Sequence, residues 1–416
     1  MHRKVSFSKA SEKPKLFIFA DAAADTGFAQ VTHNLIDQLW TKWDIHVLAI
    51  NYQGDPHPIQ KKAKLYNPSA KVQGDFYGVQ RVAELLGQIK PDLFFMINDP
   101  WVAANYLPLI RKYKGPKVLY TPIDALNLKR AYIEPLNEFD HVIGYTQFAI
   151  DQMLDRGLTT AHSNIPHGID TKLYRPIDKA EARKVNGFPD DWFIVNVTDR
   201  NQIRKRIDLA FYYFTEWVNS TNKPESVKIH YHGALQDDGW DIIDLANELG
   251  IKDRLIITAP NITAQNGLPL ELMPYVYAPA DMGVSETMGE GWGLTAMERM
   301  AMGIPMALPN FSAYGEWAKD AAHMLEISNI PFFNKGGLNT RGGIATLESS
   351  VAAFELFYTN PEYRAKIGKA GYDLVTQKRF QWYVIAKQFD QVFTQVIANH
   401  ITEEKDDGNT DRTGDT

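Results

Sequence analysis

Short, almost wholly apolar segments alternate along this chain with longer segments in which apolar residues recur every three or four positions. After the apolar segment 16–20, for example, Phe28, Val31 and Leu35 fall on one face of a predicted helix. Near-continuous apolar strands that alternate with amphipathic helices are typical of parallel sheets covered on both faces. Further strands of this kind are predicted at 45–50, 93–97, 118–121 and 142–144.

The alternation pauses near 164–178 and then begins again. The segment 174–178 is predicted to be a linker, and a second series of strands follows at 193–197, 227–231, 255–258 and 282–285. We therefore predict an α/β chain with two Rossmann-like, parallel-sheet domains that face a cleft. Their predicted bounds are 14–172 for the N-terminal domain and 173–380 for the C-terminal domain.

Both ends of the chain are polar. Residues 402–416 are predicted to form a disordered acidic tail, because they include no apolar residue to anchor them, and residues 1–13 a flexible leader with a mild basic bias. The tail holds six acids and two bases, so it accounts for most of the net charge of −6. The body is then close to neutral and has no strong footprint for binding a polyanion.

Composition excludes several classes of protein. The chain has no cysteine, which rules out disulfides, thiolate catalysis and cysteine-ligated zinc. No apolar run approaches the ~20 residues that span a bilayer, and the N-terminus has no apolar secretory core. We expect a cytoplasmic protein.

The most informative segment is the run 285–305, SETMGEGWGLTAMERMAMGIP. A helix is predicted to begin near Leu294 and to end at Gly303, since Pro305 prevents its continuation. The free N–H groups at such a helix start can bind a phosphate. Glu298 would lie roughly 6 Å along the helix axis, about the distance from a diphosphate to its ribose, and Glu290 would lie on the sugar side of the phosphates.

This segment resembles the E-x7-E signature of retaining, GT-B-fold glycosyltransferases of the group 1 type (glycosyltransferase family 4). The resemblance implies that Glu290 contacts the hydroxyl groups of the donor sugar and that Glu298 binds the ribose. It implies that the turn and helix start between them hold the diphosphate, through Gly291, Trp292, Gly293, Leu294 and Thr295. Trp292 replaces the usual Phe. The alternative is a helix that carries two solvated glutamates.

The loop 199–206 is a second element of the resemblance. Arg200 and Lys205 match the family's Arg-x4-Lys pair, whose cations neutralise the donor diphosphate. The family's Gly after the Lys is Arg206 here, so the sequence leaves open which of Arg204, Lys205 and Arg206 faces the phosphates. A solvated basic loop is the alternative. There is no Asp-x-Asp pair of the metal-dependent kind, so we expect neither a metal nor another cofactor.

In the first domain, the strand-to-helix loop 21–28 lacks the dinucleotide fingerprint but resembles the family's glycine loop. Thr26 and Gly27 are the donor-binding positions that this resemblance gives, with ordinary turn chemistry as the alternative. Asp124 stands where many relatives place a His, and we expect it either to contact sugar or acceptor or to cap a helix. His167 is interpreted as structural.

The resemblance implies a GT-B fold in which the last helix, within 381–400, crosses back to complete the N-terminal, acceptor-side domain. It also implies a retaining, metal-independent enzyme that moves a sugar from a nucleoside diphosphate sugar to an acceptor hydroxyl. A GT-B-fold sugar-nucleotide epimerase and a non-catalytic sugar-nucleotide binding protein are the alternatives. A glycan, a lipid, a protein and a modified nucleic-acid base all remain open as acceptors, as do peripheral membrane contact and the oligomeric state.

Overall fold

The computed structural model describes residues 13–23, 26–263, 267–334 and 339–410, without the side chains of 403–410. The remainder of the predicted leader and the last six residues of the predicted tail lie outside these ranges. The chain divides into two compact units, each described here by itself. The first unit comprises residues 1–121, 135–143 and 386–416, and the second comprises 122–134 and 144–385.

The first sheet has seven strands in the order β3-β2-β1-β4-β5-β6-β7. Strand β1 lies between β2 and β4 and runs parallel to both, with Phe17 opposite His46 and Phe94. Its five central residues are fully buried, which explains why the sequence is apolar without alternation. The strands are β1 Lys15–Asp21, β2 Asp44–Ile50, β3 Lys64–Tyr66, β4 Leu93–Ile97, β5 Lys117–Thr121, β6 His141–Gly144 and β7 His162–Asn164.

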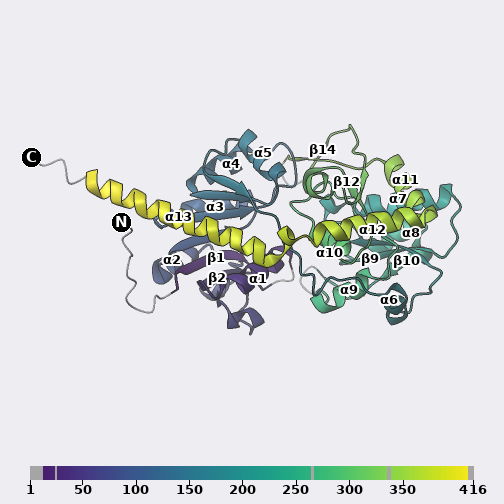
Figure 1. Cartoon of the computed structure of the whole chain (residues 1–416), viewed down its shortest axis with the longest axis horizontal. Coiled ribbons are helices and arrows are strands. Elements are labelled where there is room, and N and C mark those ends of the chain that lie inside the picture. The colour runs from purple at the N-terminus through teal and green to yellow at the C-terminus, as the bar shows by residue number, and fades with distance from the viewer. Residues whose placement is uncertain (1–12, 24–25, 264–266, 335–338, 411–416) are drawn as a thin grey trace, which may run out of the picture. The chain divides into compact units, whose positions relative to one another are not determined.

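Helices cover this sheet (Figure 1). Helix α1 is the next element after β1 and buries Val31 and Leu35 on the face predicted from the sequence. The helices of this region are α1 Gly27–Leu39, α2 Val82–Ile89, α3 Pro100–Ile110, α4 Arg130–Ile133 and α5 Gln147–Asp155.

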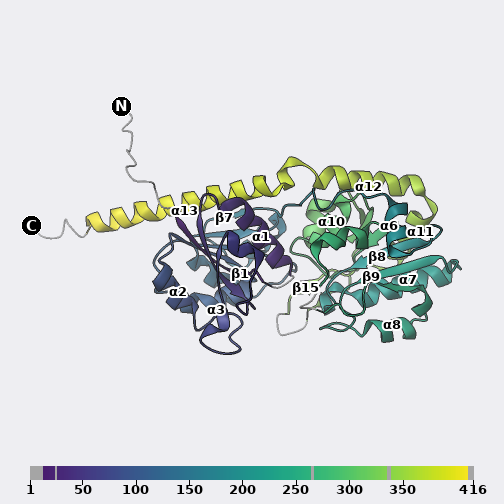
Figure 2. The same cartoon turned by 90° about the horizontal axis from the view of Figure 1, so that it is seen from below.

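The second sheet has six strands in the order β10-β9-β8-β11-β12-β13, and all its neighbouring strands run parallel. In Figure 2 it lies between α10 and α12 on one side and α7 and α8 on the other. Its strands are β8 Phe193–Thr198, β9 Val227–His232, β10 Leu255–Ile257, β11 Met282–Val284, β12 Met306–Pro309 and β13 His323–Leu325. The helices are α6 Lys179–Asn186, α7 Ile207–Ser220, α8 Ile242–Glu248, α9 Met273–Tyr277, α10 Leu294–Ala301, α11 Leu347–Thr359 and α12 Pro361–Val375, and β14 Phe332–Phe333 pairs antiparallel with β15 Arg341–Gly342.

An aromatic core holds α7 and α11 on this second sheet. Trp217 is fully buried, stacks on Phe354 and meets Phe193 edge to face. Rings of this size contribute most of the buried apolar area, which fixes the helices and so positions the loops at the carboxyl ends of the strands.

The last helix, α13 Trp382–Thr410, packs on the first unit, as predicted. Its Phe389 and Phe393 rings contact Phe95 of β4, and Phe389 also meets Tyr120 of β5 edge to face. The helix continues to Thr410, through the first residues of the predicted acidic tail. Among the described residues, no helix combines the length and the hydropathy needed to cross a membrane. The predicted α/β architecture of two Rossmann-like parallel-sheet units is confirmed.

Candidate active site

A largely buried lysine, Lys205, connects the basic loop of the second unit to the predicted sugar-binding glutamate. The Lys205 Nζ lies 2.8 Å from Asp199 Oδ1 and 2.5 Å from Glu290 Oε1. The exposed fractions of the three side chains are 11%, 1% and 6%, so the charges interact with little solvent screening. Lys205 ends a single 3₁₀ turn, Ile203–Lys205, that directly follows the loop after β8.

Arg204 supplies a second cation to the same carboxylate. Its Nη1 lies 3.3 Å from Glu290 Oε1 and donates to the Gly289 carbonyl at 3.0 Å, while its Nε lies 3.5 Å from Asp124 Oδ2. Burial by itself would raise the pKa of Glu290, but the charges of Lys205 and Arg204 outweigh it and hold that pKa below its ordinary value. Glu290 is therefore an ionised carboxylate with two cationic partners.

The other two cations of the loop are directed elsewhere. Arg200 Nε lies 2.8 Å from Asp237 Oδ2, and the Arg200 side chain is about half exposed. Arg206 binds Asp208 through Nε and Nη2, each at 2.9 Å, and its φ of 49° turns the chain into α7. Of the three candidates that spacing alone could not separate, Arg204 and Lys205 are the ones that meet Glu290.

The glycines of the 285–305 segment allow close backbone packing. A Cβ on Gly289 would overlap the carbonyl oxygen of Asp124, and one on Gly291 would lie 2.5 Å from the Cβ of Pro122. The Met288 N–H donates to the Arg204 carbonyl at 2.7 Å, which ties this segment to the basic loop. The Glu290 N–H donates to the Ser312 hydroxyl at 2.9 Å, so the backbone of the glutamate is fixed as well.

Helix α10 begins at Leu294, as predicted, and its start has no side-chain cap. Gly293 is the N-cap residue and has a φ of 91°, a conformation that favours glycine. Leu294 and Thr295 are only partly buried. The first N–H groups of a helix have no partner within the helix, so this start is suited to an anion.

Glu298 lies one turn into α10 and is buried, with 4% of its surface exposed. The Tyr277 hydroxyl donates to its Oε2 at 2.8 Å, and burial together with Glu298 raises the pKa of Tyr277 well above its ordinary value. Tyr277 stays protonated and remains a hydrogen-bond donor that orients the carboxylate.

Trp292 belongs to a buried aromatic cluster. Its ring stacks on Trp317 at 5.3 Å with an interplanar angle of 15°, and its carbonyl accepts from Trp317 Nε1 at 2.8 Å. The His167 ring lies 5.6 Å away, and burial lowers the pKa of His167 to about 3, so this histidine is neutral. The cluster fixes the turn that leads into α10.

In the first unit, the predicted donor-binding residues Thr26 and Gly27 lie at the N-terminus of α1. The Thr26 hydroxyl caps α1 by accepting from the Ala29 N–H at 3.1 Å, and it donates to Asp21 Oδ2 at 3.0 Å. Gly27 is the exposed first residue of α1. Residues 24–25 of this loop lie outside the described ranges.

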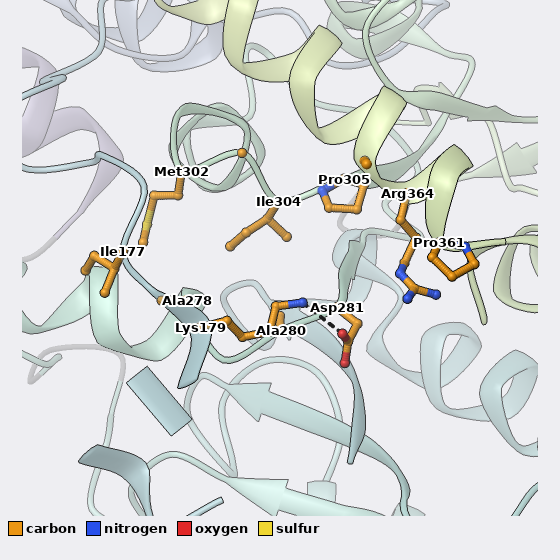
Figure 3. A pocket seen from close by; sticks show the side chains of 12 residues that line it. Ile177, Lys179, Ala278, Ala280, Asp281, Met302, Ile304, Pro305, Pro361 and Arg364 are labelled. Atoms are coloured by element: carbon orange, nitrogen blue, oxygen red, sulfur yellow. Dashed lines mark hydrogen bonds and ion pairs between the residues drawn. The ribbon is translucent and has the colours of Figure 1, made fainter. Parts of the chain in front are cut away.

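A separate cavity lies at the far end of α10 (Figure 3). Its volume is about 270 Å³, and none of the predicted site residues lines it. Lys179 reaches Asp281 there at 2.9 Å, and the apolar side chains of Ile177, Met302 and Ile304 line the same cavity. This cavity is distinct from the charged cluster around Glu290.

Sequence reasoning gave no role to several residues of the cluster. Asp199 pairs with Lys205 and accepts a hydrogen bond from the Ser285 hydroxyl. Its position directly after β8, at the carboxyl end of a parallel strand, is the feature of the sequence that could have indicated it. Ser312 and Tyr277 are distant in sequence from their partners, so no local pattern indicated them. Among the side chains that the structure describes, no group of three or more His, Asp or Glu residues is arranged to hold a metal ion.

Part of the chain is similar in sequence to curated glycosyltransferases. No family model matches the chain. The chain is 29% identical over 177 residues to the D-inositol 3-phosphate glycosyltransferase of Mycobacteroides abscessus, which covers 41% of this chain and 37% of that protein. It is 27% identical over 177 residues to the enzyme of the same name from Mycolicibacterium smegmatis, covering 41% of this chain and 38% of the relative. The matches thus span well under half the length of these curated relatives.

Solved structures match over almost the whole chain. Sucrose-phosphate synthase from Thermosynechococcus elongatus superimposes with a TM-score of 0.72 at 17% identity, over 93% of this chain and 100% of that one. Anabaena HepE in complex with UDP and glucose gives a TM-score of 0.69 at 14% identity, over 92% and 100%. The chain therefore has the GT-B fold, and its predicted resemblance to the group 1 glycosyltransferases is confirmed.

Proposed function

We propose that this protein is a retaining, metal-independent glycosyltransferase that moves a sugar from a nucleoside diphosphate sugar to an acceptor hydroxyl. One observation carries the proposal: Lys205 and Arg204 converge on Glu290 directly before the uncapped start of α10. Fixed cations and free helix N–H groups at one place suit a diphosphate, and the carboxylate beside them suits the hydroxyl groups of a sugar.

In this proposal, the cations act on the departing diphosphate. Negative charge accumulates on the diphosphate as the bond to the sugar breaks, and Lys205, Arg204 and the start of α10 stabilise that charge. These groups are positioned by Asp199 and by the Gly289 carbonyl before any donor binds, so little reorganisation is needed. In the same way they can take over the role that a metal ion has at other diphosphate sites.

Glu290 binds and orients the sugar in this mechanism. Its lowered pKa keeps it ionised, and as an acceptor of hydrogen bonds it favours the positive charge that develops on the sugar ring. By family resemblance, the acceptor hydroxyl attacks on the face that the diphosphate leaves, and a phosphate oxygen of the donor takes its proton. The configuration at the sugar is retained, and no enzyme nucleophile is required.

The comparisons support a nucleoside diphosphate hexose as donor. The relatives are named D-inositol 3-phosphate glycosyltransferases, and HepE was solved with UDP and with UDP-glucose. We propose that Glu298, held by Tyr277, accepts hydrogen bonds from the donor ribose. A cytoplasmic location fits the absence of cysteine.

A donor screen followed by a transfer assay tests the function. A donor present at 100 times its Kd should stabilise the protein by about 2.7 kcal/mol, which a thermal-shift measurement detects. The best donor should then release its nucleoside diphosphate only when an acceptor is supplied. A new sugar formed without an acceptor would indicate an epimerase, and binding without turnover would indicate a sensor. Stabilisation by no nucleotide sugar would contradict the proposal.

A further inference from the structure

Tyr314 is a buried tyrosine whose hydroxyl is not used within the free protein. Its side chain is 1% exposed, and its oxygen has no hydrogen-bond partner among the described residues. Ser285 lies near it, but the two hydroxyls do not meet at hydrogen-bonding geometry, and Ser285 donates to Asp199 at 3.1 Å. A buried hydroxyl without a partner costs free energy, so a retained one requires an explanation.

The hydroxyl lies at the start of α10. A Cβ on Gly293 would lie 2.5 Å from the Tyr314 oxygen, so the ring edge passes directly over this N-cap glycine. Gly293 offers no side-chain cap to the helix, and the first residues after it are partly exposed. An unpartnered donor and the free N–H groups of the helix start are thus side by side.

The charges around Tyr314 keep it protonated. Burial raises the pKa of Tyr314 well above its ordinary value, and the nearby carboxylates Glu290 and Asp199 raise it further. Arg299 interacts electrostatically with Tyr314; it is fully buried, and its Nη2 also has no hydrogen-bond partner among the described residues. An anion bound here would accept a hydrogen bond from the neutral Tyr314 hydroxyl and would also be attracted by the buried positive charge of Arg299.

We propose that the Tyr314 hydroxyl is a binding group for the diphosphate of the donor, held ready in the free protein and satisfied only when the phosphate arrives. This assignment rests on the proposed function and names a ligand-binding residue that the motifs of the sequence did not indicate. It explains why the hydroxyl has no partner in the free protein. It also gives a reason for glycine at position 293, because a side chain there would displace the Tyr314 ring.

The test compares Tyr314→Phe with the same substitution at a tyrosine whose hydroxyl has a hydrogen-bond partner within the protein. Phe removes only the hydroxyl, so Tyr314→Phe should leave the melting temperature of the ligand-free protein unchanged or slightly higher. It should weaken binding of inorganic pyrophosphate and of UDP by about tenfold or more, as expected for a lost hydrogen bond to a charged group. Calorimetric titration gives both affinities, and differential scanning fluorimetry gives the stability.

The control is Tyr213→Phe. The Tyr213 hydroxyl is buried as well, but it donates to the Ala345 carbonyl at 3.0 Å. This variant should show the reverse pattern, a lower melting temperature with unchanged affinity for both ligands. Equal affinity of Tyr314→Phe and wild type, or a clear loss of stability in ligand-free Tyr314→Phe, would overturn the assignment. A wild type that binds neither pyrophosphate nor any nucleoside diphosphate would instead overturn the proposed function, and this assignment with it.

Discussion

The two units carry the same kind of sheet but use the carboxyl ends of their strands differently. In the first unit, polar side chains at this edge serve the nearby backbone: Thr26 caps α1, and Asn98 accepts from the Asp99 N–H. In the second unit, charged side chains from separate segments converge, as Lys205 and Arg204 do on Glu290. Among the residues that the structure describes, fixed charge is concentrated in a buried place at the second edge, where a charged ligand interacts most strongly.

The two edges differ in the kind of interaction that their polar side chains make, although the sheets are of the same type. Hydrogen bonds between neighbours in sequence stabilise a turn and require no ligand. Ion pairs between distant segments place charges in low dielectric, where removing one partner is expensive. The comparison therefore predicts that changes in the second unit affect donor binding strongly and that changes at the first edge affect mainly stability.

Lys205→Ala should have the largest effect. It removes the cation between Asp199 and Glu290 and leaves both carboxylates buried without it. Binding of nucleoside diphosphate and of intact donor should weaken alike, by roughly 1.5–3 kcal/mol or about 10- to 150-fold in Kd. Calorimetry with both ligands measures this. Unchanged affinity would contradict the assignment of Lys205 as a diphosphate-binding residue, and Arg204 would be the next candidate to test.

Two controls accompany Lys205→Ala. Thr26→Ala in the first unit removes a helix cap, which should cost about 1 kcal/mol of folding stability and leave the affinity for nucleoside diphosphate unchanged. Arg200→Ala removes a half-exposed cation that pairs with Asp237, so its effect on binding should be smaller than that of Lys205→Ala. A loss of affinity in either control as large as that of Lys205→Ala would contradict the inferred difference between the two edges.

Glu286 offers a pH test of the interior of the second unit. Its carboxyl group is fully buried, and burial raises its pKa to about 8 against the smaller, opposite effects of Ser350 and Arg206. The folded state therefore binds one more proton than the unfolded state between its ordinary pKa of 4.5 and about pH 8, and stability should fall as the pH rises through this window. Glu286→Gln should flatten that decline in the melting temperature. An identical pH profile of wild type and variant would contradict the assignment.

Chelation should have the smallest effect. If fixed cations stabilise the leaving diphosphate, EDTA should change the initial rate of transfer by no more than about twofold. Loss of activity on chelation, restored by magnesium or manganese, would show that a metal ion takes part.

Most of the fold could be predicted from apolar segments of three to six residues. The predicted strand at 16–20 is the centre of β1, and the one at 282–285 is β11 with one extra residue. The described strands that were not predicted are β3, β7, β12, β13, β14 and β15; each has two to four residues, so a local pattern gives little signal. Their place in the sheets comes from pairing with neighbours, which a local pattern does not contain.

The candidate site was predictable only where its residues are close in the sequence. The spacing from Glu290 to Glu298 correctly indicated a helix start at Leu294 between them. Spacing could not separate Arg204 from Arg206, because the left-handed conformation of Arg206 turns its side chain to Asp208. Nor could it indicate Tyr277, which lies 21 positions before the Glu298 that it holds.

The central claim is that one segment of the second unit holds the donor, with the sugar at Glu290 and the nucleotide at Glu298. The measurement is a calorimetric titration of Glu290→Gln and Glu298→Gln with nucleoside diphosphate, paired with initial rates of transfer. Glu298→Gln should weaken the nucleoside diphosphate and the intact donor together, because that contact is equal in ground and transition states. Glu290→Gln should lower turnover while leaving the affinity for nucleoside diphosphate nearly unchanged. An equal loss of diphosphate binding in both variants would contradict the account.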